Sequence, residues 1–199
     1  MSRSIAVPPT DKLSVCVFCG AQNNVDPRHI AVGRQLGEYL AQADHRMVFG
    51  GGDCGMMGAV SNAAMEAGGE VIGVFPDHLR HMEAEHTGIT QTVIVGSMHE
   101  RKKLMFDLSD VFAILPGGFG TMDEMFEILT WHQIGLHEKP VLIFNHLDYW
   151  NPLITMMDHI INEGFAKPTN RDYYTVHQSF DELVHSLESM PRKKNVKKA

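Results

Sequence analysis

The chain has 199 residues, of which 44% are hydrophobic, and its formal net charge at pH 7 is -7. A chain of this length can bury one sizeable core, so we expect a single domain at 13–190, with an extension at 1–12 and a basic tail at 191–199. The acidic balance excludes a general nucleic-acid surface, because binding to a phosphate backbone depends on clustered Lys and Arg.

Short β-rich segments alternate with longer segments of helical periodicity. Strands are expected at 13–18, 46–49, 70–75, 92–95, 110–115 and 140–144, with another short strand at 173–176. Helices are expected at 28–43, 55–67, 98–107, 121–134, 150–163 and 180–189. Nearly continuous apolar strands are typical of a sheet covered on both faces, and the βαβα order predicts an α/β fold with a Rossmann-like doubly wound parallel sheet in three layers, αβα. The stretch 76–91 has no clear period and is expected to be a loop over the site.

The amino terminus lacks the apolar core of a signal peptide, and no apolar run approaches the length of a membrane span. Three cysteines indicate a reducing compartment, so we expect a cytoplasmic protein without a membrane partner. Cys16-x-x-Cys19 has the spacing of half a redox or zinc site, but no second pair follows it. Packing of the first strand is therefore the favoured interpretation of these two cysteines.

In such folds ligands bind beyond the carboxyl ends of the strands, where three candidate loops fall: 18–22, 49–58 and 115–124. In the second loop, glycines 50–52 leave a strand and Gly55 begins a helix. Glycine allows backbone amides to approach an anion, and a helix amino terminus attracts one, so this loop suits a phosphate. The same glycines match a dinucleotide pattern, but Glu70 begins the next strand, at the wrong end of the sheet to bind a ribose. A tight turn with close helix packing is the alternative without a ligand.

The third loop reads PGGFGTMDEM, and it combines glycines with a threonine and carboxylates at the start of a helix. Thr121 is a good N-cap, and Thr121-x-x-Glu124 is a capping box, which accounts for both residues without any function. A capping box needs no preceding glycines, however. Gly117, Gly118 and Gly120 therefore favour a phosphate held by backbone amides and the Thr121 hydroxyl, with the Glu124 carboxylate one helical turn away.

Before the third loop lies SMHERKK, at 97–103. Ser97-x-x-Glu100 is another expected capping box, so three cations fall near a helix amino terminus, where they oppose the helix dipole. Such placement favours an anion nearby. Arg101 is the residue we pair with a ligand, because its fork matches a phosphate or a developing charge, whereas Lys102 and Lys103 fit a solvated face equally well.

SMHERK followed by LPGGFGTMDE, with FCGA and GGGDCGMMG upstream, resembles the LOG (Lonely Guy) family of cytokinin riboside 5'-monophosphate phosphoribohydrolases, long labelled lysine decarboxylases. The similarity runs from about Val15 to Leu187. The resemblance implies hydrolysis of the N-glycosidic bond of an adenine-type nucleoside 5'-monophosphate, giving free base and ribose 5-phosphate. It also implies a homodimer or larger assembly with the site near the subunit contact, and no metal or cofactor.

By its motifs, the resemblance assigns Arg101 and Glu124 as the catalytic pair. It implies substrate contacts from the three loops, from the SMHERK stretch and from an acidic position near the ribose: Gly20, Ala21, Gly51, Gly52, Gly55, Met98, Lys102, Gly117, Gly118, Gly120, Thr121 and Glu83. Two positions depart from the family. Ala21 replaces the usual serine, and residues 53–54, Asp and Cys, replace a small or hydroxylic pair, which affects a polar contact to the nucleotide.

The chemistry of the residues agrees with this activity, because cleavage of a ribosyl C–N bond passes through an oxocarbenium-like state that a carboxylate stabilises. A non-catalytic nucleotide sensor on the same fold is the alternative. Pyridoxal-phosphate decarboxylation would need a Schiff-base lysine, and the three glycine-bearing loops contain none. A metal enzyme would draw on a group in the 76–91 stretch, for which solvated histidines are the favoured interpretation: His78, His81, Glu83, Glu85 and His86.

Overall fold

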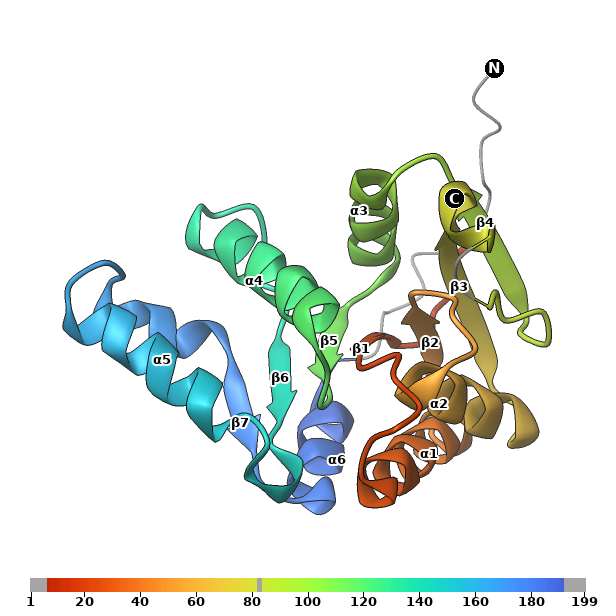
Figure 1. Cartoon of the computed structure of the whole chain (residues 1–199), viewed down its shortest axis with the longest axis horizontal. Helices are drawn as coiled ribbons and strands as arrows, with labels where there is room; N and C mark the ends of the chain where they lie inside the picture. Colours follow the sequence, from red (N-terminus) through yellow and green to blue (C-terminus); the bar gives the residue numbers. More distant parts are fainter. Residues whose placement is uncertain (1–6, 82–83, 192–199) are drawn as a thin grey trace.

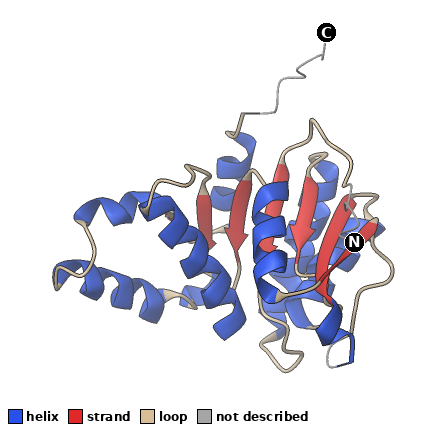
Figure 2. Ribbon diagram, turned by 90° about the horizontal axis from the view of Figure 1, so that it is seen from above, coloured by secondary structure: helices blue, strands red, loops and turns tan. Residues whose placement is uncertain are grey.

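The structure is a computed structural model that describes residues 7–81 and 84–191 (Figure 1). Within these residues, seven parallel strands form one sheet in the order β4-β3-β2-β1-β5-β6-β7. Their bounds are β1 (Ser14–Phe18), β2 (Arg46–Phe49), β3 (Glu70–Pro76), β4 (Gln91–Val95), β5 (Val111–Ile114), β6 (Val141–Phe144) and β7 (Thr175–His177). Figure 2 shows these strands running side by side. The predicted parallel sheet is therefore confirmed.

In the described part of the chain, six α-helices cover the two faces of the sheet. They are α1 (Pro27–Gln42), α2 (Gly55–Glu66), α3 (Met98–Leu108), α4 (Phe119–Gln133), α5 (Asn151–Asn162) and α6 (Phe180–Glu188). One core cluster joins α1, α2 and α6 to the sheet, and the other joins α3, α4 and α5, so the helices form two outer layers (Figure 1). The predicted three-layer fold is confirmed as well.

The strand β1 shows why the strands read as continuous apolar runs. Val15 and Val17 belong to the first core cluster, whereas Cys16 and Phe18 belong to the second. Successive side chains of a strand point to opposite faces, so a sheet covered on both faces buries them all. Cys16 and Cys19 are both buried and unbridged, which confirms that they pack in the core.

The stretch 76–91 differs from the expected loop. Its first part is a 3-10 helix, η1 (Asp77–His81), and Glu85 forms an antiparallel bridge with Gly52. The extended segment around Glu85 thus lies along the glycines after β2.

Two further 3-10 helices, η2 (His146–Asp148) and η3 (Pro168–Tyr173), precede α5 and β7.

The order of the strands creates one break in the direction of the chain. From β1 the chain crosses through α1 to β2 on one side, and from β5 it crosses through α4 to β6 on the other side. Because β1 and β5 are neighbours, the loops that follow them diverge and leave a crevice at their carboxyl ends. A ligand site is expected at this switch point.

The described part of the amino-terminal extension contacts β2 and the turn before it. In the described part of the extension, Lys12 forms an ion pair with Asp44 at 2.7 Å, and the Pro8 carbonyl accepts a hydrogen bond from Arg46. The predicted basic tail lies outside the described residues apart from Pro191. Within residues 7–81 and 84–191, no helix has both the length and the hydropathy that a bilayer crossing requires.

Candidate active site

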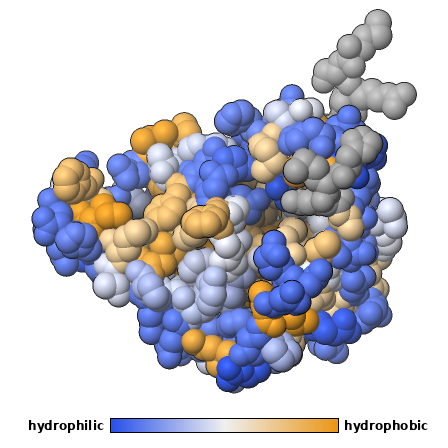
Figure 3. All heavy atoms as spheres, in the orientation of Figure 1, coloured by the Kyte–Doolittle hydropathy of each residue, from blue (hydrophilic) through white to orange (hydrophobic). Residues whose placement is uncertain are grey.

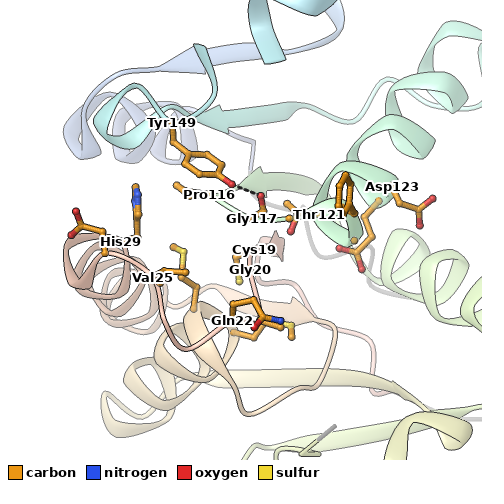
Figure 4. A pocket seen from close by; sticks show the side chains of 18 of the residues that line it. Cys19, Gly20, Gln22, Val25, His29, Pro116, Gly117, Thr121, Asp123 and Tyr149 are labelled. Atoms are coloured by element: carbon orange, nitrogen blue, oxygen red, sulfur yellow. Dashed lines mark hydrogen bonds between the residues drawn. The ribbon is translucent and has the colours of Figure 1, made fainter. Parts of the chain in front are cut away.

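A cavity of about 560 Å³ occupies the crevice between β1 and β5 (Figure 4). The loops after β1 and β5 form its floor, the first turns of α1 and α2 form one wall, and α3 and α4 form the other. The predicted residues that line it are Gly20, Ala21, Met98, Arg101, Gly117, Gly118, Gly120, Thr121 and Glu124. Parts of all three predicted loops therefore meet the SMHERK helix at one site, the loop 49–58 through Met56 and Met57.

The loop after β5 leads into α4 without a side-chain cap. Gly118 is the N-cap residue and the helix begins at Phe119, two residues before the expected start. The first amides of a helix have no partner within it, and in the described chain the amides of Phe119, Gly120 and Thr121 donate to no other backbone or side-chain acceptor. The amino terminus of α4 therefore leaves these amides without a partner, and free helix amides attract anions.

The predicted N-cap role of Thr121 is wrong, because this residue lies inside the first turn of α4 and is 3% exposed. Its hydroxyl lies against Gly117, where an added Cβ would come within 2.1 Å of Oγ1. Gly117 in turn lies close to Gly20, whose amide donates to the Pro116 carbonyl at 3.0 Å. Glycine at position 117 thus lets the two loops and the threonine meet.

Glu124 lies in the second turn of α4, and its side chain is 11% exposed. Burial raises the pKa of this carboxyl from 4.5 to about 7, while the nearby Arg101 guanidinium acts in the opposite direction. Arg101 Nη1 lies 3.8 Å from Glu124 Oε1, which is too long for a direct hydrogen bond and leaves room for a bridging group. Glu124 is thus a carboxyl group that changes its charge near neutral pH.

Arg101 extends from the first turn of α3 and is 8% exposed. Its Nε donates to the Val74 carbonyl at 3.2 Å, and its Nη2 donates to the Gly50 carbonyl at 3.0 Å. Two carbonyls thus hold the guanidinium and leave Nη1 to face the cavity. An added Cβ on Gly50 would lie 1.8 Å from Nη2, so this glycine makes room for the arginine.

The expected capping box of α3 is half confirmed. Ser97 is the N-cap residue, and its hydroxyl accepts the Glu100 amide at 3.2 Å. The Glu100 carboxylate, however, accepts the amide of Gly96 at 2.7 Å and not that of the cap residue itself. The first turn of α3 is therefore fixed, and Arg101 with it.

Other parts of the chain occupy much of the backbone of the glycine loop after β2, and its glycines lie outside the cavity lining. The Gly51 carbonyl accepts the amide of His86, and the Asp53 amide donates to the Ala84 carbonyl, both at 2.9 Å. At the start of α2, the Gly55 amide donates to the Asn23 side chain at 2.8 Å, and the Met56 amide donates to Gly20 at 3.0 Å. These contacts pair the loop with its neighbours, and Gly51, Gly52 and Gly55 do not line the cavity.

Lys102 also lies outside the cavity lining. Its amine contacts two carboxylates of α4, Asp123 at 3.0 Å and Glu127 at 3.2 Å, and its side chain is 11% exposed. It therefore connects α3 to α4 beside Glu124. The predicted ribose contact Glu83 lies outside the described residues.

The sequence prediction missed the wall opposite Glu124. Val25, His29, Met56, Met57 and Tyr149 all line the cavity. Val25 and His29 follow β1, Met56 and Met57 lie in the first turn of α2 after β2, and Tyr149 follows β6. The rule that ligands bind at the carboxyl ends of strands indicated these segments, and the two methionines stand in the GGGDCGMMG motif, but no motif contained Val25, His29 or Tyr149.

In the part of the chain that the structure describes, no group of three His, Cys, Asp or Glu side chains could hold a metal ion. His86, from the predicted alternative cluster, uses Nδ1 to accept the Gly88 amide and contacts Asn62 through Nε2. His81 and Glu83 of that cluster have no described side chain.

The fold and site together define an α/β nucleotide-site architecture: an open helix amino terminus at the switch point of a parallel sheet, with a buried carboxyl and a guanidinium beside it. A family profile described as "Possible lysine decarboxylase" matches residues 57–187. The chain is 40% identical over 182 residues to the cytokinin riboside 5'-monophosphate phosphoribohydrolase of Rhodococcoides fascians, covering 91% of each chain. It is 41% identical over 177 residues to the phosphoribohydrolase LOG5 of Arabidopsis thaliana, covering 88% of this chain and 77% of that one.

The chain therefore belongs to the LOG family of phosphoribohydrolases, as the motifs indicated. The fold is also that of a molybdenum cofactor binding protein from Rippkaea orientalis, with a TM-score of 0.69 and 21% identity over 89% of this chain and 96% of that chain. At this level of identity the second likeness concerns the fold alone.

Proposed function

We propose that the protein hydrolyses the N-glycosidic bond of adenine-type nucleoside 5'-monophosphates, giving free base and ribose 5-phosphate. One observation supports this most strongly: Glu124, whose burial raises its pKa to about 7, lies on the same helix whose open amino terminus faces the cavity. A phosphate at that terminus places the attached ribose within reach of the next helical turn. The relatives named as phosphoribohydrolases support the same reaction.

In this proposal the phosphate binds the amides at the start of α4 and the Thr121 hydroxyl. The C1'–N bond breaks and its electron pair leaves with the base, while the ionised Glu124 stabilises the positive charge that develops on the ribose. A water molecule bonds to C1', and its proton passes through Glu124 to the departing base. A carboxyl group with a pKa near 7 can both accept and return this proton at neutral pH.

Arg101 acts beside Glu124 in this scheme. Carbonyls hold its Nε and Nη2, and its Nη1 lies 4.0 Å from Met98 Sδ and 3.8 Å from the Glu124 oxygen, so Nη1 is the nitrogen nearest the carboxyl. A guanidinium at this distance keeps part of the glutamate ionised and can contact the base as negative charge develops on it. We assign the arginine to orientation of the carboxylate and to assistance of the leaving base.

The remaining walls are apolar and suit a base. Met56 and Met57 approach from α2, and Met98 approaches from the start of α3. Methionine adapts to flat and branched apolar groups alike, so this wall accommodates adenine and N6-substituted adenine. Ala21, which replaces the family's usual serine, adds no hydroxyl to the cavity.

Product analysis tests the proposed reaction. The protein is incubated with AMP, isopentenyladenosine monophosphate, GMP and CMP, and the products are separated by chromatography. We expect equimolar free base and ribose 5-phosphate from the adenine-type substrates. Release of no base from any of them would contradict the reaction and favour a non-catalytic nucleotide-binding protein.

Replacement of Glu124 tests the catalytic role. Glu124→Gln keeps the shape and removes the charge, so we expect a fall in kcat of roughly 10²- to 10⁴-fold, the usual value of acid and base catalysis. Glu127→Gln is the matched control, since Glu127 lies one helical turn later and contacts Lys102. Equal rates for Glu124→Gln and the parent would remove Glu124 from the mechanism.

A pyridoxal-phosphate decarboxylase, the activity in the profile's description, does not fit the described cavity. None of its lining residues is a lysine, so the cavity offers no amine for a Schiff base.

We further propose a cytoplasmic homodimer or larger homo-oligomer. Phe119 at the cavity and Phe165 after α5 are 89% and 87% exposed, and an apolar groove of about 240 Å³ lies between α4 and α5. Figure 3 shows apolar side chains on this side of the molecule. A second chain that covers this surface would remove it from water. Light scattering tests this proposal, with an expected mass of at least twice 22.2 kDa.

A further inference from the structure

The loop after β6 contains two residues in an unfavourable backbone conformation. Leu147 has φ 55° and Asp148 has φ 60°, both in the left-handed region. Single residues other than glycine in this region cost on the order of 1 kcal/mol or more, and leucine has no side-chain hydrogen bond to offset that cost. Leu147 is 46% exposed, so its own packing does not explain the conformation. Such strain occurs most often beside functional sites.

Hydrogen bonds from Asn145 hold the loop in this shape. Its side-chain oxygen accepts the amide of Trp150 at 2.7 Å, and its carbonyl accepts the amide of Asp148 at 3.1 Å. Its own amide donates to His177 of the neighbouring strand β7 at 2.9 Å. The strained turn is thus fixed at both ends, and it directs the next residue, Tyr149, toward the cavity (Figure 4).

The Tyr149 hydroxyl donates to the Gly117 carbonyl at 2.6 Å (Figure 4). Gly117 is the residue directly before the N-cap of α4, and its carbonyl is one side of the peptide unit whose other side is the Gly118 amide. The two groups of one peptide unit point in opposite directions. A donor that fixes this carbonyl therefore also fixes the direction of the amide that follows it.

A pair of histidines, His29 and His146, lies beside Tyr149. His29 in the first turn of α1 contacts His146 through their Nδ1 atoms at 3.0 Å, and its ring meets the Tyr149 ring edge-on with centroids 5.6 Å apart. The loop after β6 is therefore connected to α1 as well as to the loop after β5. Tyr149 has a fixed place between them.

We propose that Tyr149 is a positioning residue, which orients the amides at the start of α4 through the Gly117 carbonyl and so sets the affinity of the site for a phosphorylated ribose. This inference rests on the proposed function for the identity of the ligand. It extends that function, because the tyrosine acts on the phosphate end of the substrate and not on the reacting carbon. The strained backbone at 147–148 is what places the Tyr149 hydroxyl at the Gly117 carbonyl.

The test compares Tyr149→Phe with Tyr173→Phe, a matched control whose ring contacts His132 near the other end of α4. Calorimetric titration with ribose 5-phosphate measures the affinity. Loss of one hydrogen bond predicts a dissociation constant about three- to tenfold higher for Tyr149→Phe and a change below about twofold for the control. In kinetics with AMP, we expect KM to rise by the same factor and kcat to change less than about twofold.

Two replacements of Leu147 provide a second test, independent of the tyrosine substitution. Leu147→Gly accepts the left-handed conformation, so affinity is expected to stay within about twofold of the parent value. Leu147→Val resists it, because a β-branched residue is an outlier at positive φ, and affinity is expected to fall about as far as in Tyr149→Phe.

Three results would overturn the inference. They are an unchanged affinity of Tyr149→Phe for ribose 5-phosphate, an equal loss of affinity in Tyr173→Phe, and a parent protein that binds neither ribose 5-phosphate nor AMP. A parent that binds ribose 5-phosphate in a Tyr149-dependent way but cleaves no nucleotide would contradict the proposed function and leave the role of Tyr149 intact.

Discussion

Two glycine-rich loops of this protein resemble each other in sequence and differ in what their backbones contact. The loop at 50–55 and the loop at 116–120 each leave a buried strand and lead into a helix. Other segments pair with the Gly51 carbonyl and with the amides of Asp53 and Gly55, whereas the first amides of α4 remain open toward a cavity. The first loop makes room for Arg101, and the second leaves helix amides free, where we propose that a phosphate binds.

The difference shows that glycine content alone does not identify a phosphate site. Each buried backbone amide and carbonyl needs a partner, so the deciding question is whether the protein itself supplies it. At 50–55 it does, through residues 84–86 and the loop after β1. At the start of α4 the described chain supplies no partner for the first amides, which leaves them to water or to the phosphate that we propose.

The largest effect is expected for the stability of Glu124→Gln. Between pH 4.5 and about 7 the unfolded chain ionises this residue while the folded chain retains the proton, so the parent loses stability as pH rises through this window. Glutamine removes that loss. We expect the variant to be more stable than the parent by about 3 kcal/mol at pH 8 and by less than about 1 kcal/mol at pH 5.

Urea unfolding of both proteins at the two pH values measures this effect, and Glu127→Gln is again the control. If Glu124→Gln is no more stable than the parent at pH 8, the surroundings of Glu124 do not disfavour its charged form.

Gly50→Ala tests the loop at 50–55 and is expected to have the next largest effect. The new Cβ would lie 1.8 Å from Arg101 Nη2, so the guanidinium has to move. Displacement of a catalytic group by about 1 Å costs roughly 10² in rate, and we expect a fall of that size in kcat/KM. Steady-state kinetics with AMP checks it. A normal rate would mean that the arrangement of Arg101 at Gly50 has no part in the reaction.

Gly118→Ala tests the loop at 116–120 and is expected to have the smallest effect. Nothing lies within 4 Å of a Cβ added there, and the φ of -98° suits alanine. We expect the stability to change by less than about 0.5 kcal/mol, while KM rises a few-fold because the methyl group enters the phosphate site. If KM stays unchanged and kcat falls, the phosphate does not bind at this residue.

Most of the fold could be predicted from the sequence, because a sheet covered on both faces produces apolar runs and its helices produce a 3.6-residue period. The motifs indicated Arg101 and Glu124, which the structure brings together at the cavity and which we propose as the catalytic pair. The start of α4 was misplaced because Thr121 has the chemistry of a cap, whereas its hydroxyl lies against Gly117, a contact that depends on tertiary structure. The partners of the 50–55 loop are more than 30 residues away, and local sequence patterns do not show them.

Tyr149 was missed for a similar reason. Its position depends on a strained turn after β6 and on a hydrogen bond to a residue 32 positions earlier. Lys102 is a different case, because the family resemblance implied a substrate contact and its charge fitted a solvated face equally well, whereas the structure pairs it with carboxylates of α4. In both cases the chemistry of the side chain was visible in the sequence, and its partner was not.

A crystal structure of Glu124→Gln with a bound nucleoside 5'-monophosphate tests the central claim most directly. The proposal predicts phosphate oxygens within hydrogen-bond distance of the amides at the start of α4, with the ribose C1' facing the side chain at position 124. A phosphate bound at 50–55, or a ribose turned away from position 124, would contradict it.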